Sequence, residues 1–160
     1  MSSEDQTDPA EAFPTDGRLL GVDYGTKRVG LAVSSPDQKF AGPLENYNRR
    51  TEPLDAKHFL QIVSENRIKG LVVGLPVHLS GDEGEKAKES RVFGEWLADL
   101  TGLPLRFWDE RFTSARAEEA LLEAGLSKKK RKARMDKLAA QFMLQAYLDA
   151  PDREKTPEAM

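Results

Sequence analysis

RLLGVDYG, residues 18–25, is a short apolar run that closes with an aspartate and a glycine. Such a run predicts a buried strand that ends in a turn. KRVGLAVSS, residues 27–35, resumes the apolar pattern after a short gap and predicts the antiparallel partner of a hairpin. The first strand therefore ends on a carboxylate, Asp23, at one edge of a sheet.

Beyond this hairpin the hydrophobic pattern alternates between strands and helices. A third strand is expected over 39–49, with Pro43 marking a sheet edge or a bulge. Nearly continuous apolar runs at 68–76 and 104–111 predict two central parallel strands. The expected helices cover 53–67, 84–101, 114–124 and 135–150.

The resulting order is βββαβαβαα, with three strands joined as hairpins and two parallel strands reached through helical crossovers. This order is similar to that of the ribonuclease H-like fold, which is an α/β fold. We therefore expect a mixed five-stranded sheet, with three antiparallel strands followed by two parallel ones, and helices on both faces.

Length and charge indicate one folded domain between two tails. The chain has 160 residues, which suits a single core. Residues 1–16 and 151–160 have no hydrophobic period and are expected to be disordered, which leaves 17–150 as the folded domain. The whole chain carries a net charge of −3 and the two tails −5 and −1, so the folded part carries +3. The bulk charge therefore says little about what this domain binds.

The chain has no cysteine and only two histidines, His58 and His78. A disulfide framework, a cysteine-held zinc and a thiol nucleophile are thereby excluded, and a histidine-rich metal site is not expected. A bound metal would have mainly oxygen ligands, which suit Mg²⁺ or Mn²⁺. No apolar run is long enough to cross a bilayer and no secretory signal is visible, so we expect a cytoplasmic protein with no membrane partner.

Four carboxylates stand where the sheet can bring them together. Asp23 ends the first strand, Asp109 and Glu110 end the last strand, and Asp136 begins the last helix. If the first and last strands lie side by side, their ends converge at the edge where open α/β sheets bind ligands. Clustered carboxylates repel one another unless a cation lies between them, so the set predicts a site for hard divalent ions. Two such ions would suit the in-line displacement of a phosphodiester.

Each acid also has a simpler interpretation. An aspartate at a strand end is commonly a turn former, and an aspartate in the first turn of a helix is commonly a partner of the helix dipole. Carboxylates at the ends of two strands and at the start of the last helix, combined in this topology, favour the metal site.

SKKKRKAR, residues 127–134, holds six bases and no acid, and leads directly into Asp136. A solvated surface segment is the alternative interpretation. An enzyme that cuts nucleic acid must, however, bring a polyanion to carboxylates that repel it, and adjacent bases offset that repulsion. We therefore predict nucleic-acid contacts from Lys128, Lys129, Lys130, Arg131, Lys132 and Arg134.

Three more bases lie close in sequence to the other carboxylates and would offset their charge in the same way: Lys27, Arg28 and Arg111. Arg111 would clamp a phosphate with two hydrogen bonds, or else form a salt bridge to a neighbouring aspartate. Gly25 either lets the backbone approach a phosphate closely or serves the hairpin turn alone.

Three blocks of the sequence resemble those of the YqgF/RuvX family: LLGVDYGTKRVGLAVSSP (19–36), GLVVGLPVHLSGDEG (70–84) and DERFTSARAE (109–118). They lie in the family's order and at its spacing, and the resemblance extends over most of the folded part. It implies a ribonuclease H-like fold with an acidic metal site.

The family's motifs correspond to individual carboxylates of this chain. The resemblance places the family's first-strand aspartate at Asp23 and its last-helix aspartate at Asp136. Its DER-type carboxylate corresponds to Asp109 and Glu110, of which Glu110 is preferred as the metal ligand.

Members of this family are described as pre-16S rRNA nucleases and as Holliday junction resolvase-like proteins. The resemblance therefore implies a metal-dependent endonuclease that processes the 5′ end of pre-16S rRNA, with ribosomal particles as further partners. Branched DNA is the alternative substrate. Resolvases that cut symmetrically act as dimers, so both a monomer and a homodimer stay open.

Two other functions share this fold. DYGT (23–26) fits the phosphate-contacting first strand of the sugar kinase and actin-type ATPases, but those proteins hold ATP between two such domains and this chain has the length of one. The other alternative is a non-catalytic RNA- or ribosome-binding module. The full set of carboxylates argues against that loss of activity.

Overall fold

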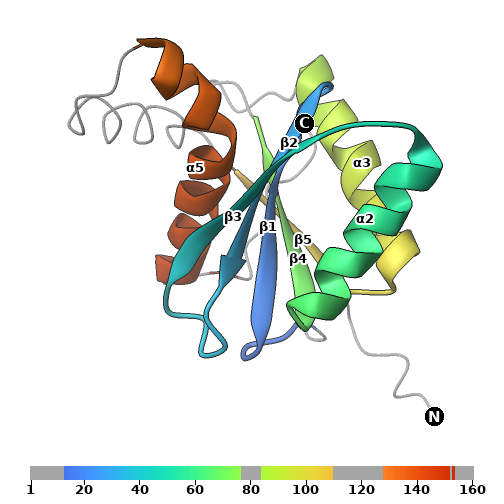
Figure 1. The fold of residues 1–160 in the computed structure, drawn as a ribbon. Helices are drawn as coiled ribbons and strands as arrows, with labels where there is room; N and C mark the ends of the chain where they lie inside the picture. Colours follow the sequence, from blue (N-terminus) through green and yellow to red (C-terminus); the bar gives the residue numbers. More distant parts are fainter. Residues whose placement is uncertain (1–12, 77–83, 110–127, 152, 154–160) are drawn as a thin grey trace.

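The computed structural model describes residues 13–76, 84–109, 128–151 and 153, and over 128–137 only the path of the helix (Figure 1). The strands are β1 (Arg18–Asp23), β2 (Arg28–Ser34), β3 (Ala41–Asn48), β4 (Ile68–Leu75) and β5 (Leu105–Asp109). The helices are α2 (Glu52–Glu65), α3 (Glu85–Thr101) and α5 (Lys128–Asp149).

All five strands form one sheet in the order β3-β2-β1-β4-β5. β3, β2 and β1 are antiparallel, whereas β1, β4 and β5 are parallel. The expected mixed sheet is thereby confirmed. The first and last strands are not direct neighbours, because β4 separates them, so the condition under which their ends would converge is not met. The crossover through α2 returns the chain beside β1, and the crossover through α3 then adds β5 on the outer side of β4.

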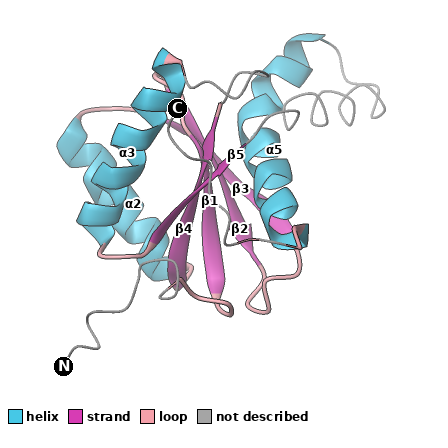
Figure 2. Cartoon of the chain, turned by 180° about the vertical axis from the view of Figure 1, so that it is seen from behind, coloured by secondary structure: helices cyan, strands magenta, loops and turns pink. Residues whose placement is uncertain are grey.

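The helices cover both faces of the sheet. α2 and α3 lie on one face and α5 lies on the other (Figures 1 and 2). The side chains of β1 alternate between these layers, as the period of a strand requires. Leu20 and Val22 are buried in the core beneath α2 and α3, whereas Leu19 is buried in the core beneath α5.

Gly21 fixes how closely α5 approaches β1. A Cβ atom at this position would lie 2.9 Å from the Cβ atom of Leu144, closer than side chains tolerate. The absence of a side chain therefore lets α5 pack directly over the middle of β1. α5 runs opposite to β1, so its early turns reach the edge where β1 ends (Figure 1).

α5 begins earlier than the apolar pattern predicts. The expected helix starts at residue 135, but the described helix already starts at Lys128 and so includes the basic run. Lysine and arginine are good helix formers, and neither glycine nor proline occurs between Lys128 and Asp149. The expected helix over 114–124 lies outside the described residues. No described helix is long and apolar enough to span a bilayer.

The packed structure extends beyond residues 17–150 at both ends. Phe13 is buried and packs edge-on against Tyr147, with their ring centroids 6.1 Å apart. Arg153 donates to the backbone carbonyl oxygen of Gln38 at 2.9 Å and to that of Leu148 at 3.2 Å. A single aromatic residue or arginine in a polar stretch has no periodicity, so the hydrophobic pattern did not reveal either contact. Residues 1–12 and 154–160 lie outside the described residues.

Candidate active site

The ends of β1, β4 and β5 form one edge of the sheet, and two of the predicted carboxylates lie on it (Figure 1). Asp23 ends β1 and pairs with Gly30 of β2. Asp109 ends β5 opposite Leu75 of β4. Both aspartates are partly buried. Two strand spacings separate their backbones, which is about 10 Å.

Asp23 and Asp109 belong to opposite faces of the sheet by the alternation of their strands. Gly21 lies under Leu144 of α5, so Asp23, two residues further on, is on the α5 face. In β5, the ring of Trp108 lies edge-on against Tyr147 of α5 with 5.4 Å between centroids. Asp109 follows Trp108 and so belongs to the α3 face.

Asp136 lies two turns inside α5 and not at its beginning. It precedes Ala140 by four residues and Met143 by seven, and both of these are fully buried against the sheet. This spacing puts its backbone on the sheet-facing stripe of the helix, about 6 Å beyond Ala140 along the axis. The structure does not describe the side chain of Asp136. Glu110 and Arg111 lie wholly outside the described residues.

The described residues alone do not complete a metal site. Among them no group of three or more His, Asp or Glu side chains is arranged to hold a metal ion. The structure therefore places Asp23 and Asp109 at one edge of the sheet and the backbone of Asp136 on the helix that covers the Asp23 face. These donors are all carboxylates, as expected for a site that suits hard cations.

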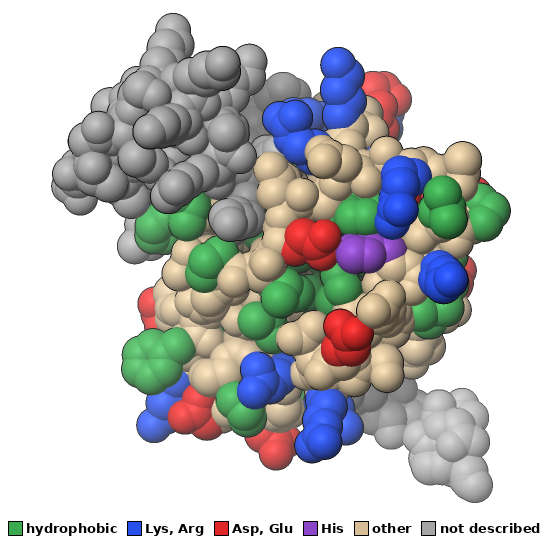
Figure 3. Space-filling model, in the orientation of Figure 1, with side chains coloured by type: hydrophobic (Ala, Val, Ile, Leu, Met, Phe, Trp, Pro, Cys, Tyr) green, Lys and Arg blue, Asp and Glu red, His purple; other side chains and the backbone are tan. Residues whose placement is uncertain are grey.

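Basic residues occur at the same edge. Lys27 and Arg28 are exposed in and just after the turn that follows Asp23. Figure 3 shows Lys and Arg side chains at the end of the molecule where β1 ends and also at the opposite end. The six bases of the run all lie within 128–134, at the start of α5, where the structure describes the backbone alone.

Gly25 is explained by the hairpin turn. A Cβ atom at Gly25 would overlap the backbone carbonyl oxygen of Arg28. Any other residue would therefore force the β1–β2 connection open.

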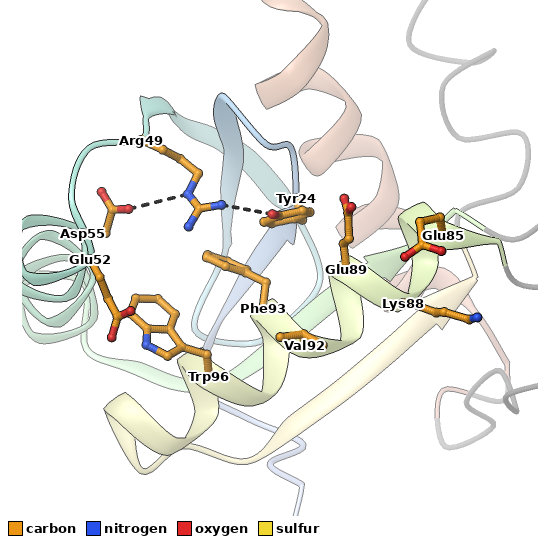
Figure 4. Close-up of a pocket in the computed structure, with 10 residues that line it drawn as sticks. All are labelled: Tyr24, Arg49, Glu52, Asp55, Glu85, Lys88, Glu89, Val92, Phe93 and Trp96. Carbon is orange, nitrogen blue, oxygen red and sulfur yellow. Dashed lines mark hydrogen bonds and ion pairs between the residues drawn. The ribbon is translucent and has the colours of Figure 1, made fainter.

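Arg49, which the sequence did not single out, contacts the turn after Asp23 at two points, and its side-chain contact with Tyr24 is drawn in Figure 4. Its backbone N–H donates to the carbonyl oxygen of Lys27 at 2.9 Å. Its Nη1 donates to the Tyr24 hydroxyl at 3.0 Å. The guanidinium carbon lies 5.4 Å from the centroid of the Tyr24 ring and 5.3 Å from that of Phe93. These contacts join the end of β3 to the turn that carries Asp23.

Asp55 supports Arg49 from the first turn of α2. It is only 1% exposed. Its Oδ1 accepts from the Tyr47 hydroxyl at 2.6 Å and from the backbone N–H of Arg50 at 2.9 Å, and its Oδ2 lies 3.5 Å from Nε of Arg49. Burial, together with the hydrogen bond to Asp55, raises the pKa of Tyr47, so this hydroxyl stays protonated and donates. In the sequence Asp55 looks only like a dipole partner of a helix start.

A cavity of about 410 Å³ lies beside this cluster, between the start of α2 and the exposed side of α3 (Figure 4). Tyr24, Phe93 and Trp96 give it aromatic walls, while Arg49 and Asp55 close one end. Tyr24 alternates with Asp23 along the chain, so the cavity lies on the α2 and α3 side of the sheet, opposite to the face of Asp23.

Comparisons with known proteins agree on one family. The family model RuvX, described as Holliday junction resolvase, matches residues 17–150. A Rhodopirellula baltica protein named "Putative pre-16S rRNA nuclease" is 44% identical over 144 residues, which cover 90% of this chain and 83% of that protein. A Rhodobacter capsulatus protein of the same name is 45% identical over 142 residues, which cover 89% of each chain.

Solved structures resemble the chain in fold. The RuvC protein of Thermus thermophilus, solved in complex with a Holliday junction substrate, superimposes with a TM-score of 0.54 at 17% identity. The match covers 82% of this chain and 92% of RuvC. At this level of identity the likeness supports the ribonuclease H-like fold and nothing finer.

Proposed function

The chain belongs to the RuvX family of Holliday junction resolvase-like proteins, and from this premise we propose that it is a metal-dependent endonuclease that processes the 5′ end of pre-16S rRNA. The reaction is the hydrolysis of a phosphodiester in the nucleic-acid backbone. The working compartment is the cytoplasm, where precursor rRNA and ribosomal particles are the partners.

The observation that carries this proposal is the position of Asp23. It ends the central strand β1 at the edge where β4 and β5 also end, on the face of the sheet that α5 covers. Ligands of open α/β sheets bind outside this edge. The named relatives, at 44% and 45% identity, support a nucleic-acid phosphodiester as the ligand.

The residues at this edge fit a hard divalent ion. Every candidate donor is a carboxylate, which suits Mg²⁺ or Mn²⁺. In our proposal Asp23, Glu110 and Asp136 would hold the ions, with Asp109 as the substitute for Glu110. Bound ions would supply Lewis-acid activation of water and of the phosphoryl oxygen. The residues of the chain itself position these carboxylates and attract the polyanion.

One cleavage assay separates the candidate substrates. Purified full-length protein with Mn²⁺ is incubated with a pre-16S rRNA fragment that contains the mature 5′ end, with unstructured RNA and with a four-way DNA junction. We expect metal-dependent cleavage of the rRNA precursor in preference to the others. Preferential cleavage of the junction would instead support a resolvase. The observation that favours this second candidate is the description of the matching family as Holliday junction resolvase. Binding of RNA with no cleavage of any substrate would support a non-catalytic module.

The basic run is electrostatically unfavourable where it stands, which argues for a functional role. Six bases fall within the first seven described residues of α5, Lys128–Arg134, with no acid in the first turn. The N-terminus of a helix carries a partial positive charge, so cations there are unfavourable and anions are favourable. A bound phosphate would offset both the helix dipole and the clustered bases. We propose that this run, together with Lys27, Arg28 and Arg111, binds the substrate backbone.

Replacing Lys128, Lys129, Lys130, Arg131 and Lys132 with glutamine is expected to weaken binding of every nucleic acid tested. The slope of log affinity against log salt should fall by about 0.7–0.9 for each phosphate that the variant no longer neutralises. Cleavage at saturating substrate should survive, because these side chains attract the polyanion and do not hold the ions. Fluorescence anisotropy over a salt series measures the slope.

Asp136→Asn is the matched variant on the same helix. It should keep or improve binding while cleavage is abolished, because it removes a negative charge from the proposed ion site. The two variants therefore separate electrostatic attraction from chemistry within a few residues. An unchanged affinity and an unchanged salt slope in the glutamine variant would show that the run is a solvated surface.

A further inference from the structure

The side chains of the turn between β1 and β2 are short or exposed at its centre. It spans residues 24–27, between the last residue of β1 and the first residue of β2. Thr26 and Lys27 are exposed, and Gly25 contributes no side chain. Asp23 is the last residue of β1 that is paired with β2, so the position of its backbone depends in part on how this turn is held. A proposed ion ligand needs its oxygen atoms placed closely, because metal sites tolerate little displacement.

Arg49 holds this turn at both of its ends. The backbone N–H of Arg49 binds the carbonyl oxygen of Lys27, and Nη1 of Arg49 binds the hydroxyl of Tyr24. Tyr24 directly follows Asp23 in the chain. The ring of Tyr24 also packs against the ring of Phe93, with 4.9 Å between their centroids, and against the guanidinium, so this side chain has little freedom.

Arg49 is itself held by Asp55, a buried residue that cannot readily move. Asp55 is fixed by the hydroxyl of Tyr47 and the backbone N–H of Arg50. Its Oδ2 and the Nε of Arg49 are buried without a hydrogen-bond partner among the described residues, and they face each other at 3.5 Å. The buried charge of Asp55 would be costly without a partner, so the pair favours keeping the guanidinium against the turn.

We propose that Arg49 is a positioning residue that holds the β1–β2 turn, and through it Asp23, in the geometry that the ion site requires. The inference rests on the proposed function for the role of Asp23. It extends that function to a residue on the opposite side of the sheet, which touches neither the substrate nor the ions. Partners that orient metal ligands typically contribute about 10- to 100-fold to metal affinity or activity.

Two substitutions test the proposal from its two ends. Arg49→Gln removes the guanidinium, and Tyr24→Phe removes only the hydroxyl that accepts from it. We expect each to raise the Mn²⁺ concentration for half-maximal cleavage about tenfold, with little change in the affinity for metal-free nucleic acid. The double variant should be no worse than the more severe single variant, because both remove the same link.

Arg50→Gln is the matched control. Arg50 is the neighbouring arginine, is exposed, and lies over the Tyr47 ring at 5.5 Å without contacting the turn in any described hydrogen bond. The Arg50→Gln variant loses one positive charge, as the Arg49→Gln variant does. We expect its Mn²⁺ dependence to stay close to that of the wild type. An equal effect of the two substitutions would overturn the proposal, because charge alone would then explain it.

Amide hydrogen exchange in the metal-free full-length protein gives a readout that needs no activity. In Arg49→Gln we expect faster exchange in a peptide covering residues 23–28 and unchanged exchange in β4. Unchanged exchange over 23–28 would overturn the proposal, as would weaker binding of metal-free nucleic acid, which would make Arg49 a substrate contact. If the Asp23→Asn variant binds Mn²⁺ as tightly as the wild type, the proposed function fails. The exchange experiment would then still show whether Arg49 holds the turn.

Discussion

Asp23→Asn is expected to lower the rate of metal-dependent cleavage by roughly 10³-fold or more, which corresponds to about 4 kcal/mol of barrier. The substitution keeps the shape of the side chain at the end of β1 but removes the charge that would hold a divalent ion. The rate at saturating substrate and saturating Mn²⁺ is the quantity to measure. Nucleic-acid affinity should be unchanged or higher, because the substitution removes a negative charge from the binding edge.

Asp99→Asn is the control for this experiment. Asp99 is an exposed acid near the end of α3, so the variant has the same change in charge and chemistry away from the edge where β1 ends. Thermal unfolding of both variants should resemble that of the wild type, since Asp23 is only partly buried. Wild-type turnover by Asp23→Asn would remove this residue from the site and, with it, the main support for the proposed function.

The sequence predicts the sheet well because the strands carry their own signal. β1 and β4 are apolar runs that end in turn residues, and the two crossover helices have clear amphipathic faces. α5 shows the limit of this approach. Its first turns are basic and have no apolar period, so their helical state follows from residue propensity and not from the pattern.

The site was predictable where function depends on position along a strand, and unpredictable where it depends on contacts across the fold. Asp23 stands out because it ends a strand. Arg49 and Asp55 do not stand out, because an arginine after a strand and an acid in a first helical turn are both common on protein surfaces. Only the fold brings Arg49 against Tyr24, 25 residues earlier in the chain.

Glu110→Gln is expected to be more damaging than Asp109→Asn, although the two acids are neighbours in the chain. The preference for Glu110, which the family resemblance suggests, gains a physical reason from β5. Trp108 packs against Tyr147 of α5, so the alternation of the strand assigns Asp109 to the α3 face, opposite to Asp23. In the proposed site, ions held by Asp23 and by Asp136 of α5 would need ligands on the α5 face, which Asp109 would not supply without a change in the course of β5.

We therefore expect a loss of roughly 10³-fold in cleavage for Glu110→Gln, as for any ligand of the ion site, and less than about tenfold for Asp109→Asn. Both variants remove one charge from the same edge, so they serve as controls for each other. Mn²⁺ binding measured without substrate should weaken in Glu110→Gln and stay near the wild type in Asp109→Asn. The reverse result would assign the role to Asp109 and would require an irregularity, such as a β-bulge, that turns its side chain to the α5 face.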